Sequence, residues 1–407
     1  DEEILAFNDG FWMDDALWIH DWAWAIVSAL FLATILLSVA RISLLGFLVL
    51  RSRLHTPTTD PGFRPFVSVL IPAYNEDQVI SKTLDALLRS DYSDYEVVVI
   101  DDGSQDSTRG VVERYSAHSP RVRCLSKPNG GKFSALNLAL EQARGDYVVT
   151  IDADTLVRPT TVAALVAPFS DPAVDAVCGN VKVGNPRNLL TKFQSVEYIT
   201  TQNFDRRAFE AMNCISVVPG ATGAWKKSAV LHIGGYSGET LTEDADLTLT
   251  LLEAGGKVVY APDALSSTEA PETLRDLYKQ RFRWSFGIYQ SLWKHRRSFF
   301  KGSLGWMALP NMLIFQLFWP MLSPIGDLVF LYALFTGNAH AIVVGYVTFL
   351  IMDAVASVVA YSLDKDPYRG MWPILIQRFY YRQFMYVVTF KTVLAALAGR
   401  RHTWNKL

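Results

Sequence analysis

Three short runs decide the fold of this chain: FVSVLIPAYNE (residues 66–76), EVVVIDDGS (residues 96–104) and YVVTIDAD (residues 147–154). Each begins with apolar residues and ends in polar ones, and a fourth β-rich run is VRCLS (residues 122–126). Amphipathic stretches separate these runs, near Gln78–Leu88, Asp106–Tyr115 and Phe133–Ala143. Strands that alternate with helices predict an α/β domain with a mostly parallel sheet and right-handed crossovers.

Polar residues follow the predicted strands at the edge where such sheets bind their ligands. Asp152 and Asp154 stand at i and i+2, so they point the same way and can share one divalent cation. Mg²⁺ or Mn²⁺ prefers such oxygens and is usually shared with a phosphate group. Asp101 and Asp102 either join this site or form an Asx turn before the next helix, and the two roles are compatible.

Composition excludes some classes of function. The chain has 407 residues, of which 50% are hydrophobic and 19% charged, so it fills more than one domain core and is not disordered. Its formal charge of -2 gives no global basic field for nucleic acid, which we do not expect as a partner. The three cysteines have neither the spacing of a zinc site nor the density of a disulfide framework.

Bunched apolar residues predict a membrane protein. Residues 22–50 carry a single charge, Arg41, and are long enough for a transmembrane helix. Residues 1–21 are acidic, whereas basic residues follow the helix, so the positive-inside rule places the amino terminus outside. Further apolar blocks are Met307–Phe335, Ala339–Leu363 and Met371–Leu397. Prolines leave open whether the first is a kinked span or a re-entrant piece plus a span, and part of the last could lie flat at the interface.

These patterns divide the chain into six parts. They are an extracytoplasmic segment (1–21), a transmembrane helix (22–50), a cytoplasmic domain (51–270), a basic amphipathic interface helix region (271–303), a transmembrane bundle of about three spans (304–399) and a tail (400–407).

Two further motifs have both a binding and a structural interpretation. Lys127–Lys132 (KPNGGK) is a glycine turn before a helix, which offers backbone N–H groups and Lys132 to an anion, or is a plain turn with a solvated lysine. It does not match a P-loop. Val218–Trp225 (VPGATGAW) places small residues before an aromatic, as a close-packed sugar site requires, although Trp225 could belong to the core.

The motifs PAYNE, DDGS, DAD, Thr242-Glu243-Asp244 and QRFRW (residues 280–284) occur in one order over roughly residues 65–300. In this order the chain resembles the processive, membrane-embedded family-2 glycosyltransferases, which include the poly-N-acetylglucosamine, chitin, hyaluronan and cellulose synthases. The resemblance implies a GT-A-like nucleotide-sugar-binding domain inserted between transmembrane helices. It implies a multi-pass protein of the bacterial inner (plasma) membrane with a cytoplasmic catalytic domain. The expected partners are a UDP-sugar, the growing polysaccharide and the lipid bilayer.

The resemblance also implies roles for single residues. Asp244 is the expected general base, unless Glu243 and Asp244 only favour the dipole of the helix that they begin. Asp154 and Asp152 are the expected ligands of Mg²⁺ or Mn²⁺ on the diphosphate. The expected donor-binding residues are Ala73, Tyr74, Glu76, Asp101, Asp102, Lys132, Asp152, Gln280 and Arg283. The expected acceptor-binding residues are Gly220, Ala221, Thr222, Trp225, Glu243 and Trp284.

The resemblance thus implies a processive, inverting β-glycosyltransferase that polymerises a sugar from a UDP donor and moves the polymer across the membrane. The segments KPNGGKFSALN and VPGATGAW most resemble the corresponding segments of N-acetylglucosamine polymerases, so UDP-N-acetylglucosamine is the expected donor. The alternatives are transfer of one sugar to a polyprenyl phosphate, synthesis of another β-glucan or hyaluronan-type polymer, and a non-enzymatic membrane scaffold. A fused or associated polysaccharide deacetylase, or a small accessory membrane subunit, is a hypothetical further partner.

Overall fold

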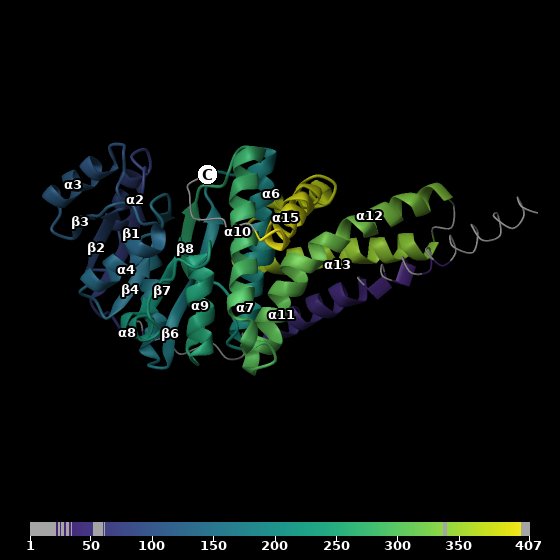
Figure 1. Cartoon of the computed structure of the whole chain (residues 1–407), viewed down its shortest axis with the longest axis horizontal. Coiled ribbons are helices and arrows are strands. Elements are labelled where there is room, and N and C mark those ends of the chain that lie inside the picture. The colour runs from purple at the N-terminus through teal and green to yellow at the C-terminus, as the bar shows by residue number, and fades with distance from the viewer. Residues whose placement is uncertain are drawn as a thin grey trace, which may run out of the picture. The chain divides into compact units, whose positions relative to one another are not determined.

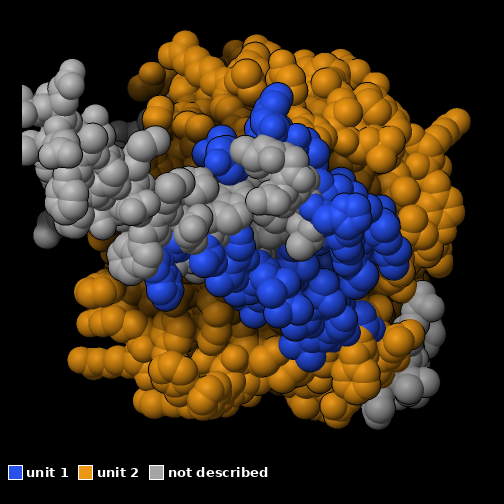
Figure 2. Space-filling model, turned by 90° about the vertical axis from the view of Figure 1, so that its right-hand side faces the viewer, with its two compact units in different colours: residues 1–46, 322–356 blue, residues 47–321, 357–407 orange. Residues whose placement is uncertain are grey.

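The computed structural model describes residues 22, 25, 28, 29, 32, 33, 35–51, 60, 62–336 and 340–399. The chain divides into two compact units (Figure 2), one of residues 1–46 and 322–356 and the other of residues 47–321 and 357–407. The predicted extracytoplasmic segment (1–21) and tail (400–407) lie outside the described residues, as does part of the predicted helix 22–50.

Within its described residues the second unit contains an eight-stranded sheet with the order β3-β2-β1-β4-β7-β6-β8-β5 (Figure 1). The strands are β1 (Val67–Ala73), β2 (Tyr95–Asp101), β3 (Val122–Ser126), β4 (Tyr147–Thr150), β5 (Leu156–Val157), β6 (Val174–Val183), β7 (Gly223–Lys226) and β8 (Lys257–Thr268). The first four strands pair in parallel, as the sequence predicts.

The expectation of a mostly parallel sheet is confirmed in part, because β6 and β8 also pair in parallel but the whole sheet is mixed. β7 runs antiparallel to both β4 and β6, and β5 runs antiparallel to β8. The reversal follows a turn in which the Thr222 N–H donates to the Pro219 carbonyl at 3.1 Å. β7 has only four residues, too few for a readable apolar pattern, so the sequence does not reveal its direction.

A large apolar cluster lies on one face of this sheet. Val67, Val69 and Ile71 of β1 alternate toward it, and Ile80 and Leu84 of the following helix pack against them. β2 is buried along its whole length, which explains its continuous apolar sequence, because helices cover both faces of a parallel sheet.

Helices connect and cover the strands. In the order of the chain they are α2 (Ile80–Leu88), α3 (Thr108–His118), α4 (Lys132–Gln142), α5 (Thr161–Val166), α6 (Leu189–Glu197), α7 (Phe204–Glu210), α8 (Lys227–His232), α9 (Glu243–Glu253) and α10 (Leu274–Lys294). α2, α3 and α4 fall where the sequence predicts them. α10 lies beside α9 and also packs against the helix α15 near the end of the chain (Figure 1).

The carboxy-terminal helices are α11 (Leu309–Asn311), α12 (Trp319–Thr336), α13 (His340–Asp364), α14 (Ile374–Gln377) and α15 (Tyr381–Leu397), with π-helical turns at Leu304–Ala308 and Met312–Phe318. Among the described residues, Val343–Asp364 is long and apolar enough to cross a membrane. The bent pair Leu304–Met321 and Gly326–Tyr332 passes the same test as one broken span. The number of membrane spans stays a prediction.

A buried ion pair fixes α10 against α6 and α15. The Arg281 Nη2 atom lies 2.8 Å from Glu197 Oε2, and the Tyr381 hydroxyl donates to the same carboxylate oxygen. The guanidinium also lies 4.4 Å from the centre of the Trp284 ring. Arg281 is 3% exposed and Tyr381 is 5% exposed, so the cation is shielded from water, whereas the Glu197 side chain is 21% exposed.

Replacing Arg281 with alanine is expected to lower the free energy of unfolding by about 3 kcal/mol, because it leaves the Glu197 carboxylate without its cation. Thermal unfolding in detergent measures the effect. Arg296→Ala is the matched control, because Arg296 is exposed and its guanidinium rests over Trp293 at 4.6 Å. Equal melting temperatures for the two variants would contradict the structural role of the buried pair.

Candidate functional site

Lys132 joins three segments that lie far apart in the sequence. Its Nζ atom is 2.7 Å from Asp152 Oδ1 and 3.2 Å from Glu243 Oε1. Lys132 begins α4, Asp152 follows β4, and Glu243 begins α9. A small cavity adjoins this point and is lined by residues that include Lys132, Asp152, Gly220, Trp225, Tyr236, Glu243 and Asp244. The structure therefore brings the DAD, TED and KPNGGK motifs into one site.

The lysine is held in its charged form. Burial opposes the charge, but the carboxylates of Asp152, Glu243 and Asp244 outweigh it and raise the pKa of Lys132. The cation is also held against backbone, because a side chain at Gly220 would place its Cβ 2.7 Å from Lys132 Nζ. The ammonium group can bind a phosphate oxygen, and the carboxylates that outnumber it favour a divalent cation that accompanies the diphosphate.

Asp244 lies at the first turn of α9 and is partly exposed. Its carboxylate accepts hydrogen bonds from the Gly220 N–H at 3.3 Å and the Ala245 N–H at 2.9 Å. Burial and the neighbouring Glu243 raise the pKa of Asp244 to about 6. A carboxylate with a pKa near neutrality is a better proton acceptor than an ordinary surface aspartate.

Asp154 lies near two other carboxylates. Burial, Asp152 and Glu76 raise the pKa of Asp154 to about 6. Among the residues that the structure describes, no group of three or more His, Cys, Asp or Glu side chains is arranged to hold a metal ion. The carboxylates of Asp152 and Asp154 nevertheless fit a hard divalent cation that takes its remaining ligands from water and a substrate phosphate.

Asp101 and Asp102 are each 2% exposed, and their carboxylates accept hydrogen bonds from other groups of the protein. Asp101 accepts from the Ser104 N–H at 3.2 Å, which agrees with the turn interpretation. Asp102 accepts from the Gly131 N–H at 2.8 Å and pairs with Lys127 at 2.6 Å. Asp102 thereby shapes the KPNGGK turn that presents Lys132, and direct nucleotide contact by either aspartate stays a prediction.

The loops after β1 and β2 are bonded to each other. The Asn75 N–H donates to the Ser104 hydroxyl at 3.0 Å, and the Glu76 N–H donates to the Thr108 hydroxyl at 2.7 Å. Ala73 ends β1 opposite Asp101. An open hollow lies over these loops and is lined by residues 75–79, 105 and 106. Contact of Ala73, Tyr74 and Glu76 with a nucleoside stays a prediction.

Of the residues predicted to bind the acceptor, some are partly buried and others lie fully in the protein interior. Ala221 and Trp284 pack against the same apolar cluster, which contains Tyr198. Thr222 is fully buried, and its hydroxyl bonds to Ser266 and to the Ala221 carbonyl. Trp225 in β7 is 1% exposed, and its indole N–H has no partner among the described residues. Thr222 and Trp225 thus lie in the protein interior, and their expected contact with a sugar stays a prediction.

Gln280 and Arg283 lie on α10 with Trp284. Gln280 and Trp284 are four residues apart and so share one face of the helix. The Gln280 Oε1 atom is buried and has no partner among the described residues. The role of Gln280 and Arg283 at a donor stays a prediction.

Tyr236 is a residue of the cavity that the sequence did not suggest. The Asn137 side chain holds it by accepting from its N–H and donating to its carbonyl, both at 2.8 Å. Gly234 and Gly235, with φ of 90° and 77°, form the turn that precedes it. The two glycines predict a turn, but nothing in the sequence predicts where that turn lies in space.

Residues 64–287 match the family model described as "Glycosyltransferase like family 2". The chain is 32% identical over 227 residues to the poly-β-1,6-N-acetyl-D-glucosamine synthase of Staphylococcus aureus (strain COL), a match that covers 56% of this chain and 55% of the relative. The Staphylococcus epidermidis synthase of the same name is 30% identical over the same shares. The chain spans about half the length of the curated relatives it matches.

One solved structure shows the same fold. It is a mannosyltransferase from Pyrobaculum calidifontis in complex with GDP-mannose and Mn²⁺, with a TM-score of 0.63 and 22% identity. The alignment covers 91% of this chain and 99% of that one. The similarity supports a GT-A-like α/β fold with a mixed sheet.

Proposed function

The chain belongs to glycosyltransferase family 2, and on this premise we propose that it polymerises N-acetylglucosamine from UDP-N-acetylglucosamine with inversion at the anomeric carbon. The observation that carries the proposal is the contact of Lys132 with both Asp152 and Glu243, next to Asp244. This contact supports a site in which Lys132 binds the diphosphate and Asp244 acts as the base. The Staphylococcus synthases that the chain matches are named for a polymer of the same sugar.

The proposed reaction uses the groups of this site in a single displacement. The Asp244 carboxylate accepts the proton of the acceptor hydroxyl, whose oxygen bonds to the anomeric carbon of the donor as the bond from that carbon to the diphosphate oxygen breaks. The Lys132 ammonium group stabilises the negative charge that grows on the leaving UDP. A Mg²⁺ or Mn²⁺ ion held by Asp152 and Asp154 would supply further positive charge beside the diphosphate.

Processivity and translocation are also part of the proposal. Asp364, at the end of α13, is bound by Lys182 of β6 at 2.7 Å and by Arg207 of α7 at 2.9 Å. β6 also carries Val181 and Val183 of the apolar cluster beside Ala221 and Trp284. These contacts join the end of an apolar helix to a strand that packs beside the expected acceptor residues, which supports polymer synthesis next to membrane helices. We further propose a multi-pass membrane location with the catalytic domain in the cytoplasm.

A donor screen tests the proposal. Purified protein receives single radiolabelled UDP-sugars with Mg²⁺ or Mn²⁺, and the product is digested with linkage-specific glycosidases. We expect a long product from UDP-N-acetylglucosamine. Product from UDP-glucose alone, or a single sugar on added polyprenyl phosphate, would contradict the proposed donor or the proposed polymerisation.

The rate of transfer is expected to fall as the pH drops through about 6, because protonation of Asp244, whose pKa is about 6, removes the base. Initial rates between pH 5 and pH 8, roughly the range that brackets this titration, give the profile. A rate that does not change over this range would exclude a base with this pKa.

Gly220→Ala is expected to lower the rate about tenfold, because the new Cβ displaces Lys132 from Asp152 and misplaces the cation. Gly110→Ala in α3 is the control, since a Cβ there meets no atom within 4 Å. Equal rates for the two variants would show that the position of Lys132 is unimportant.

A further inference from the structure

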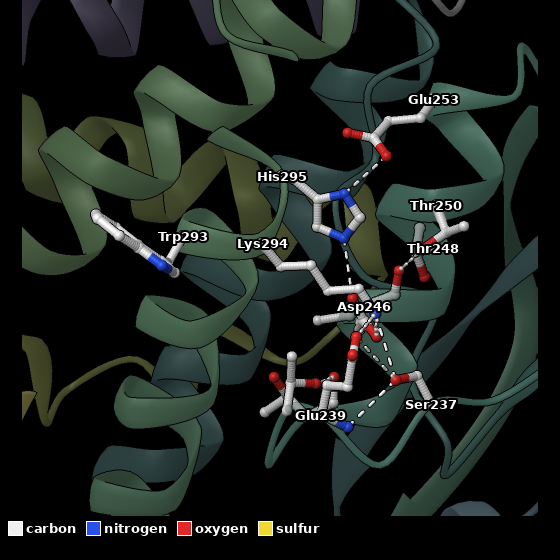
Figure 3. Close-up of polar contacts among 12 residues, drawn as sticks. Ser237, Glu239, Asp246, Thr248, Thr250, Glu253, Trp293, Lys294 and His295 are labelled. Atoms are coloured by element: carbon white, nitrogen blue, oxygen red, sulfur yellow. Dashed lines mark hydrogen bonds and ion pairs between the residues drawn. The ribbon is translucent and has the colours of Figure 1, made fainter. Parts of the chain in front are cut away.

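The helix that carries Asp244 is held by the end of α10. Asp246, two residues after Asp244 and 1% exposed, accepts from Lys294 Nζ at 2.8 Å and from His295 Nε2 at 2.9 Å (Figure 3). His295 follows α10 directly and is 3% exposed. Figure 3 shows its ring between α9 and α10. Two residues at the end of α10 thereby hold the start of α9.

The ring of His295 has a carboxylate on each side. Its Nδ1 atom lies 2.9 Å from Glu253 Oε2, opposite the bond from Nε2 to Asp246. Ionised carboxylates only accept hydrogen bonds, so both ring nitrogens donate and the ring is an imidazolium. Asp246 and Glu253 are seven residues apart, which is about two turns of a helix, so His295 spans one face of α9.

The other groups around the ring complete a charge network. Lys294 also pairs with Glu239 at 2.8 Å and donates to the Ser237 hydroxyl at 3.3 Å. The Ser298 hydroxyl donates to Glu253. The ionisable groups of this network are two cations and three carboxylates from α9, the segment before it and the end of α10.

α10 also supports the segment before Asp244. The Leu241 N–H donates to Gln290 Oε1 at 2.9 Å. A Cβ on Gly287 would lie 2.6 Å from the Thr242 side chain, so helix and segment are in close contact. The segment before α9 and the first turn of α9 are therefore both fixed by one helix, which also carries the QRFRW motif.

We propose that His295, as an imidazolium between Asp246 and Glu253, is a positioning residue that fixes the start of α9 and with it the direction of the Asp244 carboxylate. The inference rests on the proposed function, in which Asp244 is the base. His295 does not touch the reacting atoms.

The expected pH dependence has a definite sign. Although burial opposes it, hydrogen bonds to Asp246 and Glu253 raise the pKa of His295 to about 9. The bridge is complete below the usual pKa of histidine and is lost as the pH rises through about 9. Loss of the proton leaves one carboxylate facing a ring nitrogen that no longer donates.

Three variants of the full chain test the inference. His295→Gln removes the imidazolium, Glu253→Gln removes one anion but keeps an acceptor, and His232→Gln in α8 is the control on an exposed histidine. We expect His295→Gln to lower kcat about 10- to 100-fold with little change in the KM for the donor, because it misplaces the base but not the nucleotide site. In wild type kcat should fall above about pH 9, and Glu253→Gln should move this fall about one unit lower.

The outcomes distinguish failure of the proposed function from failure of the positioning role. An inactive wild type overturns the proposed function and the positioning role together. An active wild type whose alkaline fall in kcat does not move in Glu253→Gln overturns the positioning role alone, even if His295→Gln fails to fold. A His295→Gln variant that folds and matches His232→Gln in kcat also overturns it.

Discussion

Asp244→Asn is expected to lower kcat by about 10²- to 10⁴-fold, the usual contribution of a general base. The asparagine side chain keeps the shape of aspartate, and its single oxygen can still accept from the Ala245 N–H, the shorter of the two bonds, so α9 should begin as before. It cannot accept the proton of the acceptor hydroxyl. Initial rates with saturating UDP-sugar measure the loss, and calorimetry should show that UDP still binds.

Asp263→Asn is the matched control, because Asp263 is an exposed carboxylate of β8. Its rate should equal that of wild type. Full activity of Asp244→Asn would assign the base to another group.

Asp154→Asn is expected to reduce the rate about 10²-fold, which corresponds to about 3 kcal/mol of lost transition-state stabilisation. The change removes one of the two carboxylates that fit a divalent cation, so the dependence of the rate on Mn²⁺ should move to higher concentrations. Titration with Mn²⁺ in the presence of UDP measures this shift.

Asp146→Asn provides the comparison, since Asp146 is exposed and stands just before β4, the strand that precedes Asp152. An Asp154→Asn enzyme with the Mn²⁺ dependence of wild type would show that the cation, if used, lies elsewhere.

The first four strands could be predicted because their signals are local. Short apolar runs between amphipathic stretches identify β1, β2, β3 and β4, and β3 has the predicted bounds. β7 could not be predicted in this way. Its position between β4 and β6 depends on pairing with residues that are distant in the sequence.

The same distinction between local signals and tertiary contacts decides which parts of the site could be predicted. The sequence places Asp152 and Asp154 at a strand end, and the resemblance adds Asp244 and Glu243. It does not reveal that Asp102 bonds to the backbone of the KPNGGK turn, because that bond joins segments nearly thirty residues apart. Nor does it identify the bridges made by Arg281 and His295, in which a polar side chain finds its partner only through tertiary packing.

The most direct test of the proposed site is an experimental structure of the protein with UDP and Mn²⁺ bound. We expect the diphosphate to lie against Lys132, with Asp154 and Asp152 facing the cation and Asp244 on the acceptor side. A diphosphate bound away from Lys132 and these three aspartates would contradict the proposal that they act together on one nucleotide-sugar.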